Sequence, residues 1–320
     1  MKRESLEKQQ VFIYLAGIIL GLMVGVKFPG QSGFLELALW PLLGMLLYTT
    51  FTQIPLAHLR EAFSDSRFMS AAVVGNFIAL PLIVWGLMSV GPDLTSVKLG
   101  ILLVLLVPCT DWFITFTHLG GGDTKRAIAF SPVSLLLQLL LLPVYLWLFL
   151  GAEITIGVVQ RELILAFFGL IVLPLVAAFF TEKWVEKRES REAILNIFGW
   201  LPVPLLALVV FSISAAQVSV VIDSLGILPS LFAIFVAFLL IAGVLSVVLS
   251  KIFSLPISQG RVLAFSLGSR NSFVVLPLAL TLPSSFELTV VVIVFQSLVE
   301  LFGMAVYIWW VPKKLYPTST

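Results

Sequence analysis

The sequence predicts an all-α polytopic membrane protein with ten transmembrane helices. Of its 320 residues, 60% are hydrophobic and only 11% are charged, and the mean hydropathy of +1.11 lies far above that of soluble globular domains. The apolar residues form ten runs, and a helix needs about 20 such residues to cross a hydrocarbon layer of roughly 30 Å. Two of the runs are interrupted in the middle by polar residues.

The runs follow one another with short polar connections, so we expect one membrane domain over residues 1–320 and no soluble domain. They cover residues about 11–27, 33–54, 68–90, 97–119, 125–150, 161–181, 193–216, 228–250, 260–283 and 286–311.

The basic residues predict the orientation of these spans. With ten spans both termini share one side of the membrane, and that side carries fifteen Lys and Arg residues. The other side carries three, Lys27, Lys98 and Arg161, and Arg270 lies within a span. Cytoplasmic loops carry the excess of basic residues. We therefore expect a multi-pass protein of the cell (inner) membrane with both termini in the cytoplasm.

A division near residue 155 gives five spans to each half, about 1–155 and 156–320. An odd number of spans per half makes the halves enter the membrane in opposite senses, as in the inverted-topology repeats of many secondary transporters. The two interruptions support this division, because they fall in the fourth span of each half, which are spans four and nine. The break in span four contains Pro108–Asp111, and the break in span nine contains Gly268–Ser272.

Paired breaks in corresponding spans are the best sequence indication of a transporter's binding site. Backbone freed from a helix at membrane depth is tolerated only where protein or water satisfies it. We therefore predict that the two broken helices cross and that substrate binds at the crossing. The candidate binding residues are Cys109, Thr110, Asp111, Arg270, Asn271 and Ser272.

Asp111 and Arg270 are charged residues at membrane depth, where each costs about 2.5 to 3.5 kcal/mol or more. Two interpretations stay open. In one, they form a buried ion pair that locks the crossing and binds nothing. In the other, Arg270 and the helix N-termini at the breaks form a positive pocket for an anionic group.

Three stretches carry a family resemblance. The stretch PCTDWFITFTHLGGGD (Pro108–Asp123) combines Pro-Cys-Thr, an apolar and aromatic run and a closing Leu-x-x-Gly-Asp. An Asn, aromatic, then Pro-Leu pattern occurs in span three at Asn76, Phe77, Pro81 and Leu82, and the last span carries an acidic residue, Glu300, in SLVELFGM. Together with the span order, these stretches resemble the bile acid:sodium symporter superfamily, and most closely its arsenite efflux permeases.

The resemblance implies ten helices in two inverted repeats, with a core domain that contains the two crossing helices and a smaller panel domain. Substrate then binds near the crossing and is exposed to alternate sides as the core moves against the panel. Cys109, the only cysteine, takes the position of the arsenite permeases' thiol, a soft ligand that suits trivalent arsenic. The alternative for Cys109 is a small buried hydrophobic residue.

Span nine departs from the family pattern. The arsenite permeases and the sodium-coupled members carry a carboxylate there, whereas this chain has Arg270 followed by Asn271 and Ser272. The positions in span four that are polar in sodium-coupled members are apolar here, around Phe113 and Ile114. Our hypothesis is that Arg270 takes the electrostatic role of a bound sodium ion, which predicts sodium-independent transport.

Ion coupling is then expected to use a proton. Glu300 is the favoured carrier, because an intramembrane carboxylate is a functional candidate by default. A structural hydrogen-bonding role for Glu300 is the alternative. Asp111 is the second candidate for ion coupling, although an arginine partner would keep it ionised.

The predicted function is a secondary active transporter that exports a small oxyanion or its neutral acid, with arsenite as the leading candidate and a proton as the coupling ion. The alternative is a bile-acid-symporter-like carrier for an organic anion. An intramembrane enzyme is not expected, because the sequence has no HExxH or DDxxD motif and only two histidines. We expect no cofactor and no metal site. The expected partners are a small anionic substrate and the lipid bilayer, without nucleic acid, and the sequence leaves the oligomeric state open.

Overall fold

The computed structural model describes residues 3–28, 32–54, 65–150, 165, 167–188 and 191–317. Every regular element in these ranges is a helix, apart from one isolated bridge at the two breaks. The predicted all-helical class is therefore confirmed for the described residues. The predicted repeat boundary near residue 155 and Arg161 lie outside them.

Seven helical stretches of the described chain are long and apolar enough to cross a membrane. They are Gly33–Phe51, Ser66–Val90, Thr124–Phe149, Phe167–Glu186, Ala193–Ala216, Leu228–Ile252 and Ser284–Leu315. The first predicted span contains the shorter apolar helix Phe12–Lys27, and spans four and nine are each divided into two short helices.

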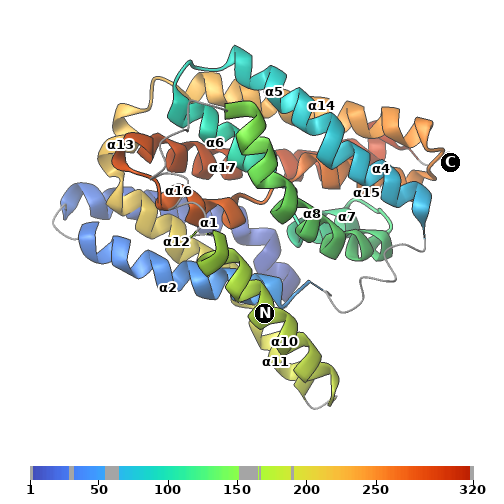
Figure 1. Cartoon of the computed structure of the whole chain (residues 1–320), viewed down its shortest axis with the longest axis horizontal. Coiled ribbons are helices and arrows are strands. Elements are labelled where there is room, and N and C mark those ends of the chain that lie inside the picture. The colour runs from blue at the N-terminus through green and yellow to red at the C-terminus, as the bar shows by residue number, and fades with distance from the viewer. Residues whose placement is uncertain are drawn as a thin grey trace.

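Figure 1 shows the helices in chain order. In the N-terminal half they are α1 (Arg3–Lys27), α2 (Ser32–Phe51), α4 (Ser66–Val74), the π-helical turn η3 (Gly75–Ala79), α5 (Leu80–Val90), α6 (Thr95–Leu105), α7 (Trp112–Leu119) and α8 (Thr124–Leu150). In the C-terminal half they are η5 (Phe167–Val172), α10 (Leu173–Glu186), α11 (Glu192–Phe198), α12 (Pro202–Ala216), α13 (Val218–Asp223), α14 (Leu228–Ile252), α15 (Ile257–Gly268), α16 (Ser272–Leu280), η7 (Ser284–Phe286), α17 (Glu287–Trp310) and η8 (Val311–Leu315).

These helices pack as two groups (Figure 1). In the four-helix group, α12 packs against both α1 and α2, and α10 packs against α2. The crossing group consists of α4 to α8 and α14 to α17, and α14 packs on α15 and α17 while α6 packs on α17. Contacts between the groups are sparser and join α1 to α17 and α2 to α16. The short helix α13, which follows α12, also packs on α17.

The contact between α1 and α12 depends on glycines spaced four residues apart in α1. A Cβ atom at Gly25 would lie 2.3 Å from the carbonyl oxygen of Ala215, and one at Gly21 would lie 2.4 Å from that of Phe211. Small residues at this spacing let two membrane helices approach closely. The four-helix group is therefore held by direct backbone proximity as well as by side-chain packing.

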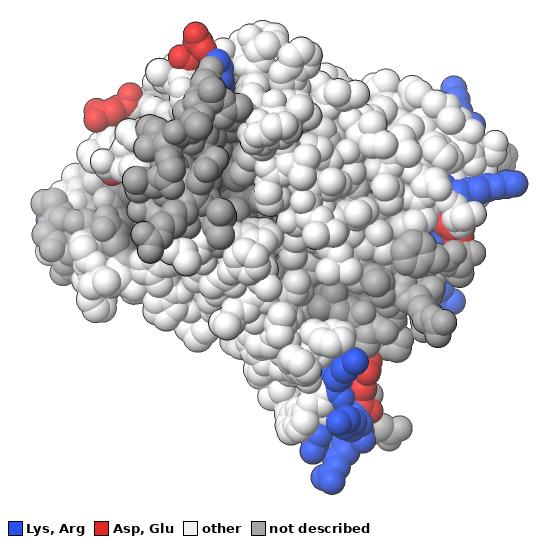
Figure 2. Space-filling model, in the orientation of Figure 1, with Lys and Arg blue, Asp and Glu red and all other residues white. Residues whose placement is uncertain are grey.

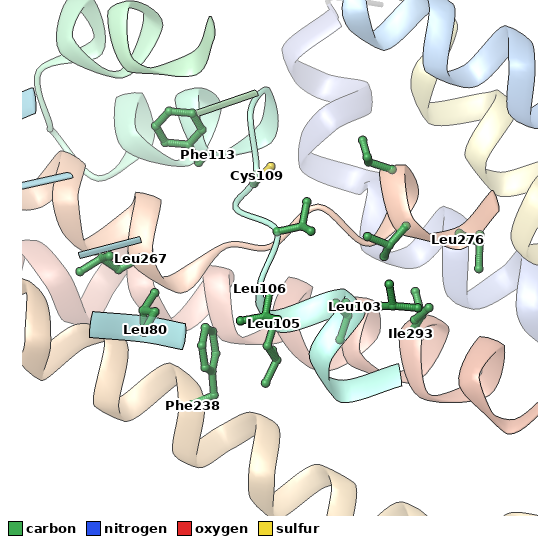
Figure 3. Close-up of a cluster of buried hydrophobic side chains, with 14 of the residues drawn as sticks. Leu80, Leu103, Leu105, Leu106, Cys109, Phe113, Phe238, Leu267, Leu276 and Ile293 are labelled. Atoms are coloured by element: carbon green, nitrogen blue, oxygen red, sulfur yellow. The ribbon is translucent and has the colours of Figure 1, made fainter. Parts of the chain in front are cut away.

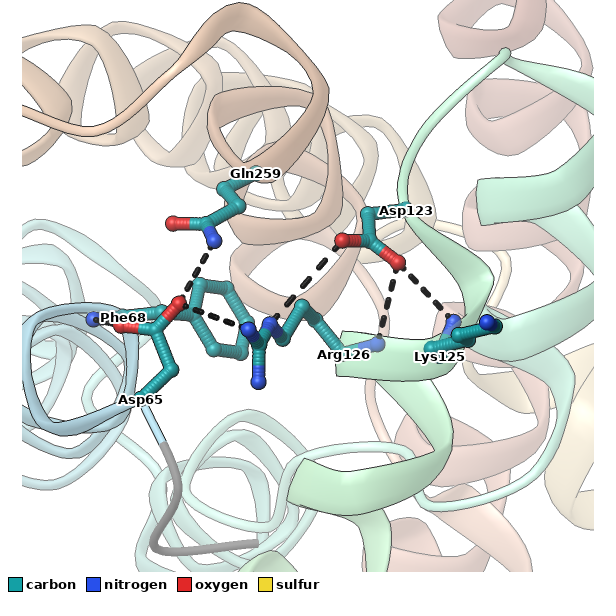
Figure 4. A network of polar contacts seen from close by, with 6 residues as sticks. All are labelled: Asp65, Phe68, Asp123, Lys125, Arg126 and Gln259. Carbon is teal, nitrogen blue, oxygen red and sulfur yellow. Dashed lines mark hydrogen bonds and ion pairs between the residues drawn. The ribbon is translucent and has the colours of Figure 1, made fainter.

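On the face shown in Figure 2, the exposed charged side chains lie at the margins, and the described surface between them is uncharged. At one margin a polar network joins the first turns of α4, α8 and α15 (Figure 4). Asp65 caps α4 by accepting from the Phe68 amide at 3.2 Å, accepts from Gln259 Nε2 at 2.7 Å and pairs with Arg126 at 3.3 Å. Arg126 also lies 3.9 Å from the carboxylate of Asp123. The network ties three helices of the crossing group together.

Candidate functional site

The two predicted breaks lie side by side within the crossing group. The segments between α6 and α7 and between α15 and α16 run antiparallel, wrapped in buried leucine side chains (Figure 3). The amide of Cys109 donates to the carbonyl of Ser269 at 3.1 Å, and the amide of Asn271 donates to the carbonyl of Val107 at 2.7 Å. Each break thus satisfies backbone groups of the other, as membrane depth requires.

Arg270 stands opposite Pro108 in this bridge, and its side chain turns into a cage of oxygen atoms. Its Nη2 lies 2.8 Å from the carbonyl oxygens of both Ser266 and Leu267 and 2.9 Å from Asn76 Oδ1, and its Nη1 lies 3.3 Å from the carbonyl oxygen of Leu105. These carbonyls close α15 and α6. The guanidinium therefore neutralises the negative ends of two helix dipoles.

Arg270 is buried, with 2% of the residue exposed. The ring of Phe238 in α14 lies 5.4 Å from the guanidinium carbon, within range of a cation–π contact. The Nε atom of Arg270 is buried and makes no hydrogen bond. The side-chain bonds of Arg270 run to neutral oxygens, and none of them runs to Asp111.

Asn76, which accepts from the Arg270 guanidinium, lies in the π-helical turn η3. Its Nδ2 donates at 3.0 Å to the Ala72 carbonyl and to the Ser266 hydroxyl, which leaves Oδ1 directed at Arg270. The preceding residue, Gly75, lies so close to α15 that a Cβ atom there would be 2.8 Å from the Leu267 side chain. π-Helical turns within α-helices frequently occur at functional sites.

The other face of the crossing is formed by the first turns of α7 and α16. Asn271 caps α16, with Oδ1 accepting from the Val274 amide at 3.4 Å, and its Nδ2 donates to Thr110 Oγ1 at 3.3 Å. The hydroxyl of Ser131 in α8 donates to the carbonyl of Thr110. The bond between Asn271 and Thr110 brings the N-terminal ends of α7 and α16 next to each other, and helix dipoles favour negative charge at such ends.

Cys109 and Asp111 lie on this same face. Cys109 is buried, and its thiol donates to Asp111 Oδ1 over 3.5 Å. Asp111 is the N-cap residue of α7 and is partly buried. The pair is thus an acid and a thiol in contact beside the start of a broken helix.

Glu300 from α17 lies directly behind the break of span nine. Its Oε2 accepts from the backbone amide of Arg270 at 2.9 Å and from Gln296 Nε2 at 2.7 Å. Gln296 Oε1 in turn accepts from the Ser272 hydroxyl at 2.8 Å. Gln296 therefore connects Glu300 to the first residue of α16.

An aromatic stack covers the first turns of α7 and α16 where the two helix groups meet. Trp112 is the first residue of α7, and its ring centroid lies 5.1 Å from that of Phe273 in α16. Tyr14 of α1 stacks on Trp112 with centroids 5.8 Å apart and planes inclined by 7°. Tyr14 is 2% exposed. The stack links the four-helix group to both broken helices.

The sequence-predicted residues therefore lie around one crossing, but in two separate environments. Arg270 faces the C-terminal ends of α6 and α15, whereas Thr110, Asp111 and Asn271 lie at the N-terminal ends of α7 and α16. The sequence did not single out Gln296 above other polar residues, and it did not identify the aromatic stack. Trp112 and Phe273 each directly follow a candidate residue, which was the available signal. In the described part of the chain, no group of three or more His, Cys, Asp or Glu side chains could hold a metal ion.

Comparison with known proteins agrees with this architecture. A search of curated proteins finds no significant match to the chain. Residues 40–224, more than half of the sequence, match the profile described as the sodium bile acid symporter family. The match is to the family as a whole and does not extend to the arsenite permeases in particular. The multi-pass membrane chain, with its paired broken helices, therefore belongs to the sodium bile acid symporter family, whose members are transporters and not enzymes.

Proposed function

We propose that the protein is a sodium-independent secondary transporter of a small organic anion. The family match favours this carrier over arsenite export. The observation that carries the proposal is the oxygen cage around Arg270. Three main-chain carbonyls and one amide oxygen at 2.8–3.3 Å offer hard neutral ligands of the kind that an alkali cation would use, and a tethered guanidinium occupies them. A permanent cation at this place removes the need for sodium.

The substrate anion is proposed to bind at the N-terminal ends of α7 and α16. Main-chain amides of these first turns, the Asn271 amide group and the Thr110 hydroxyl are the donors that the anion would use there. The stack of Tyr14, Trp112 and Phe273 supports a substrate with an apolar or ring-bearing body, because the rings cover the same ends from the side of the four-helix group. The positive charge of Arg270 would then attract the anion electrostatically without contacting it.

Proton coupling through Glu300 is part of the proposal. The carboxylate receives two hydrogen bonds, one of them from the backbone of the broken helix, so a change in its protonation would alter the contacts of the break itself. Through Gln296 the same change would reach Ser272 at the start of α16. Asp111, in contact with Cys109, remains the second proposed carrier.

The proposed architecture is ten helices in two inverted repeats, with both termini in the cytoplasm of a cell that carries the protein in its inner membrane. The composition of the two helix groups supports it. The four-helix group takes the first two predicted spans of each half, and the crossing group takes the last three of each half. Corresponding spans thus occupy corresponding places.

Transport into proteoliposomes tests the proposal. A panel of labelled organic anions should be taken up at equal rates in sodium and in choline buffer, and an inward proton gradient should change the rate. Uptake that requires sodium would refute the fixed-cation role of Arg270. Uptake that ignores the proton gradient would refute the coupling role of Glu300.

Arsenite export is the second candidate, and the contact of the Cys109 thiol with Asp111 favours it, since a thiolate is the soft ligand that trivalent arsenic prefers. Expression in an arsenite-sensitive host tests it. Resistance that is lost in Cys109→Ala would support export, and the absence of any resistance would leave organic anions as the substrate class.

A further inference from the structure

We propose that a groove between α2, α10 and α11 binds one anionic phospholipid. The groove has a volume of about 700 Å³ and is open on one side. It lies in the four-helix group, away from the crossing. Its described lining consists of Tyr48, Phe180, Thr181, Lys183, Trp184, Lys187, Ile194 and Phe198.

The floor of the groove is apolar and held in place by specific contacts. The hydroxyl of Thr181 donates to the Ala177 carbonyl at 2.9 Å, so the Tyr48 hydroxyl is the donor in its 2.8 Å bond to Thr181. The Tyr48 ring also meets Phe198 edge to face with centroids 5.6 Å apart. These contacts bridge all three helices, so the groove is formed before a ligand enters. An acyl chain fits such a floor because it has no polar groups to satisfy.

The mouth of the groove is basic. Lys183 in the last turn of α10 and Lys187 at its C-cap lie four residues apart and both line the groove, where their ammonium groups can flank a single phosphate. None of the eight described lining residues is acidic. Glu182 is buried away from this exposed face, and Glu186 is exposed but does not line the groove.

A third positive charge lies beside the mouth. The guanidinium of Arg191 stacks on the Trp184 ring at 3.9 Å and donates to the Trp184 carbonyl at 2.9 Å. The lower tip in Figure 2, which is the α10–α11 end in Figure 1, shows several Lys and Arg side chains together with a smaller acidic area beside them. The groove therefore joins an apolar floor to a cationic rim.

The position of the groove matches the headgroup level of a bilayer. The apolar stretch Phe167–Glu186 ends at this point, and tryptophan with lysine at the end of a span is typical of the membrane interface. A free phosphate would use the lysines but not the apolar floor. A zwitterionic lipid would bring a cationic headgroup against Lys183, Lys187 and Arg191. An anionic phospholipid complements both parts, and basic pockets between membrane helices bind such headgroups.

Native mass spectrometry of the full-length protein, purified in detergent and titrated with phosphatidylglycerol or phosphatidylcholine, tests this proposal. The unaltered protein should retain one phosphatidylglycerol molecule in preference to phosphatidylcholine. The double variant Lys183→Gln, Lys187→Gln should bind phosphatidylglycerol about twenty-fivefold more weakly, since each lysine near an anionic lipid contributes roughly a fivefold factor. Both lysines are exposed, so the variant is expected to fold.

The double variant Lys313→Gln, Lys314→Gln is the matched control, because it also removes two lysines beside a tryptophan, Trp309. It should retain the preference of the unaltered protein. Equal losses in both double variants, or no preference for the anionic lipid, would overturn the proposal. So would a lipid-free dimer that disappears in the Lys183 and Lys187 variant, because the groove would then be a contact between two copies.

Discussion

Replacing Arg270 with alanine is expected to destabilise the protein and to make its stability depend on an added cation. The change removes the guanidinium that now donates to four oxygen atoms. These are the carbonyl oxygens of Ser266 and Leu267 at 2.8 Å, Asn76 Oδ1 at 2.9 Å and the carbonyl oxygen of Leu105 at 3.3 Å. Removing a buried charge also removes its desolvation cost, which offsets part of the loss. Each buried acceptor left unsatisfied costs about 1 to 3 kcal/mol, so with part of the sum offset we expect a net loss of about 3 to 5 kcal/mol.

This loss corresponds to a measurable shift in the melting temperature. For 320 residues, an unfolding entropy of about 2.1 cal/mol/K per residue converts it to a decrease of roughly 4 to 8 °C. A cation that enters the emptied cage stabilises the folded state by mass action, which is about 1.4 kcal/mol at ten times its dissociation constant. Sodium or guanidinium should therefore restore about 2 °C to the Arg270→Ala variant and nothing to the unaltered protein.

The assay is thermal unfolding of purified protein in sodium, guanidinium at low concentration, or choline. Arg261→Ala is the control, because Arg261 also donates to carbonyls, at 2.9 Å to Tyr316 and 3.0 Å to Gly121, but lies at the margin of the fold. It should lose less stability and show no response to cations. An Arg270→Ala variant that melts at the same temperature as the unaltered protein would refute the stabilising role of Arg270, and equal stabilisation of both proteins by sodium would refute the emptied cation site.

Three further outcomes are expected. Asn76→Leu should lower the free energy of unfolding by about 1 to 3 kcal/mol in the unaltered protein, because it leaves the Arg270 guanidinium without this acceptor. In an Arg270→Ala background the loss should be clearly smaller, since the guanidinium is already absent. Equal losses in the two backgrounds would contradict this. Gly25→Ala should destabilise the contact of α1 with α12, whereas Gly44→Ala, where a Cβ atom meets nothing within 4 Å, should be neutral or stabilising by about 0.5 to 1 kcal/mol; thermal unfolding of both variants decides. Partial burial raises the pKa of Asp65, but the Phe68 amide, Gln259 and Arg126 outweigh burial and lower the pKa. The stability that Asp65 provides is therefore full above about pH 4 and is lost as the pH falls through the lowered pKa. Asp65→Asn should lack this acid-dependent loss of stability, and a pH profile identical to that of the unaltered protein would argue against the network.

The sequence predicted the broken helices correctly because their signals are local. Pro108 has no amide hydrogen and disfavours helix at the preceding residue, and the polar stretch at Gly268–Ser272 interrupts an apolar run. No prediction was made from Gly17, Gly21 and Gly25, although their spacing in the sequence is typical of close helix packing. The partner helix could not have been predicted, since any apolar span offers a similar surface.

The partner of Arg270 depends on contacts between residues far apart in the chain. Its opposite charge in the sequence pattern is Asp111, yet its side chain bonds to Asn76, Ser266, Leu267 and Leu105. The cage forms because two helices end at one point and expose their last carbonyls there. Carbonyls belong to every residue type, so no sequence pattern marks those that will be left free.

By itself, the sequence determined that the chain spans a membrane repeatedly and that two of its helices are broken, because hydropathy and helix-breaking residues act within one segment. Only the tertiary structure decided that the breaks satisfy each other's backbone, that Arg270 occupies helix ends and not a carboxylate, and that Tyr14 joins Trp112 and Phe273. These outcomes depend on the direction and depth at which distant helices meet. The free energy of such contacts depends on two segments at once, so the sequence of one segment does not determine it.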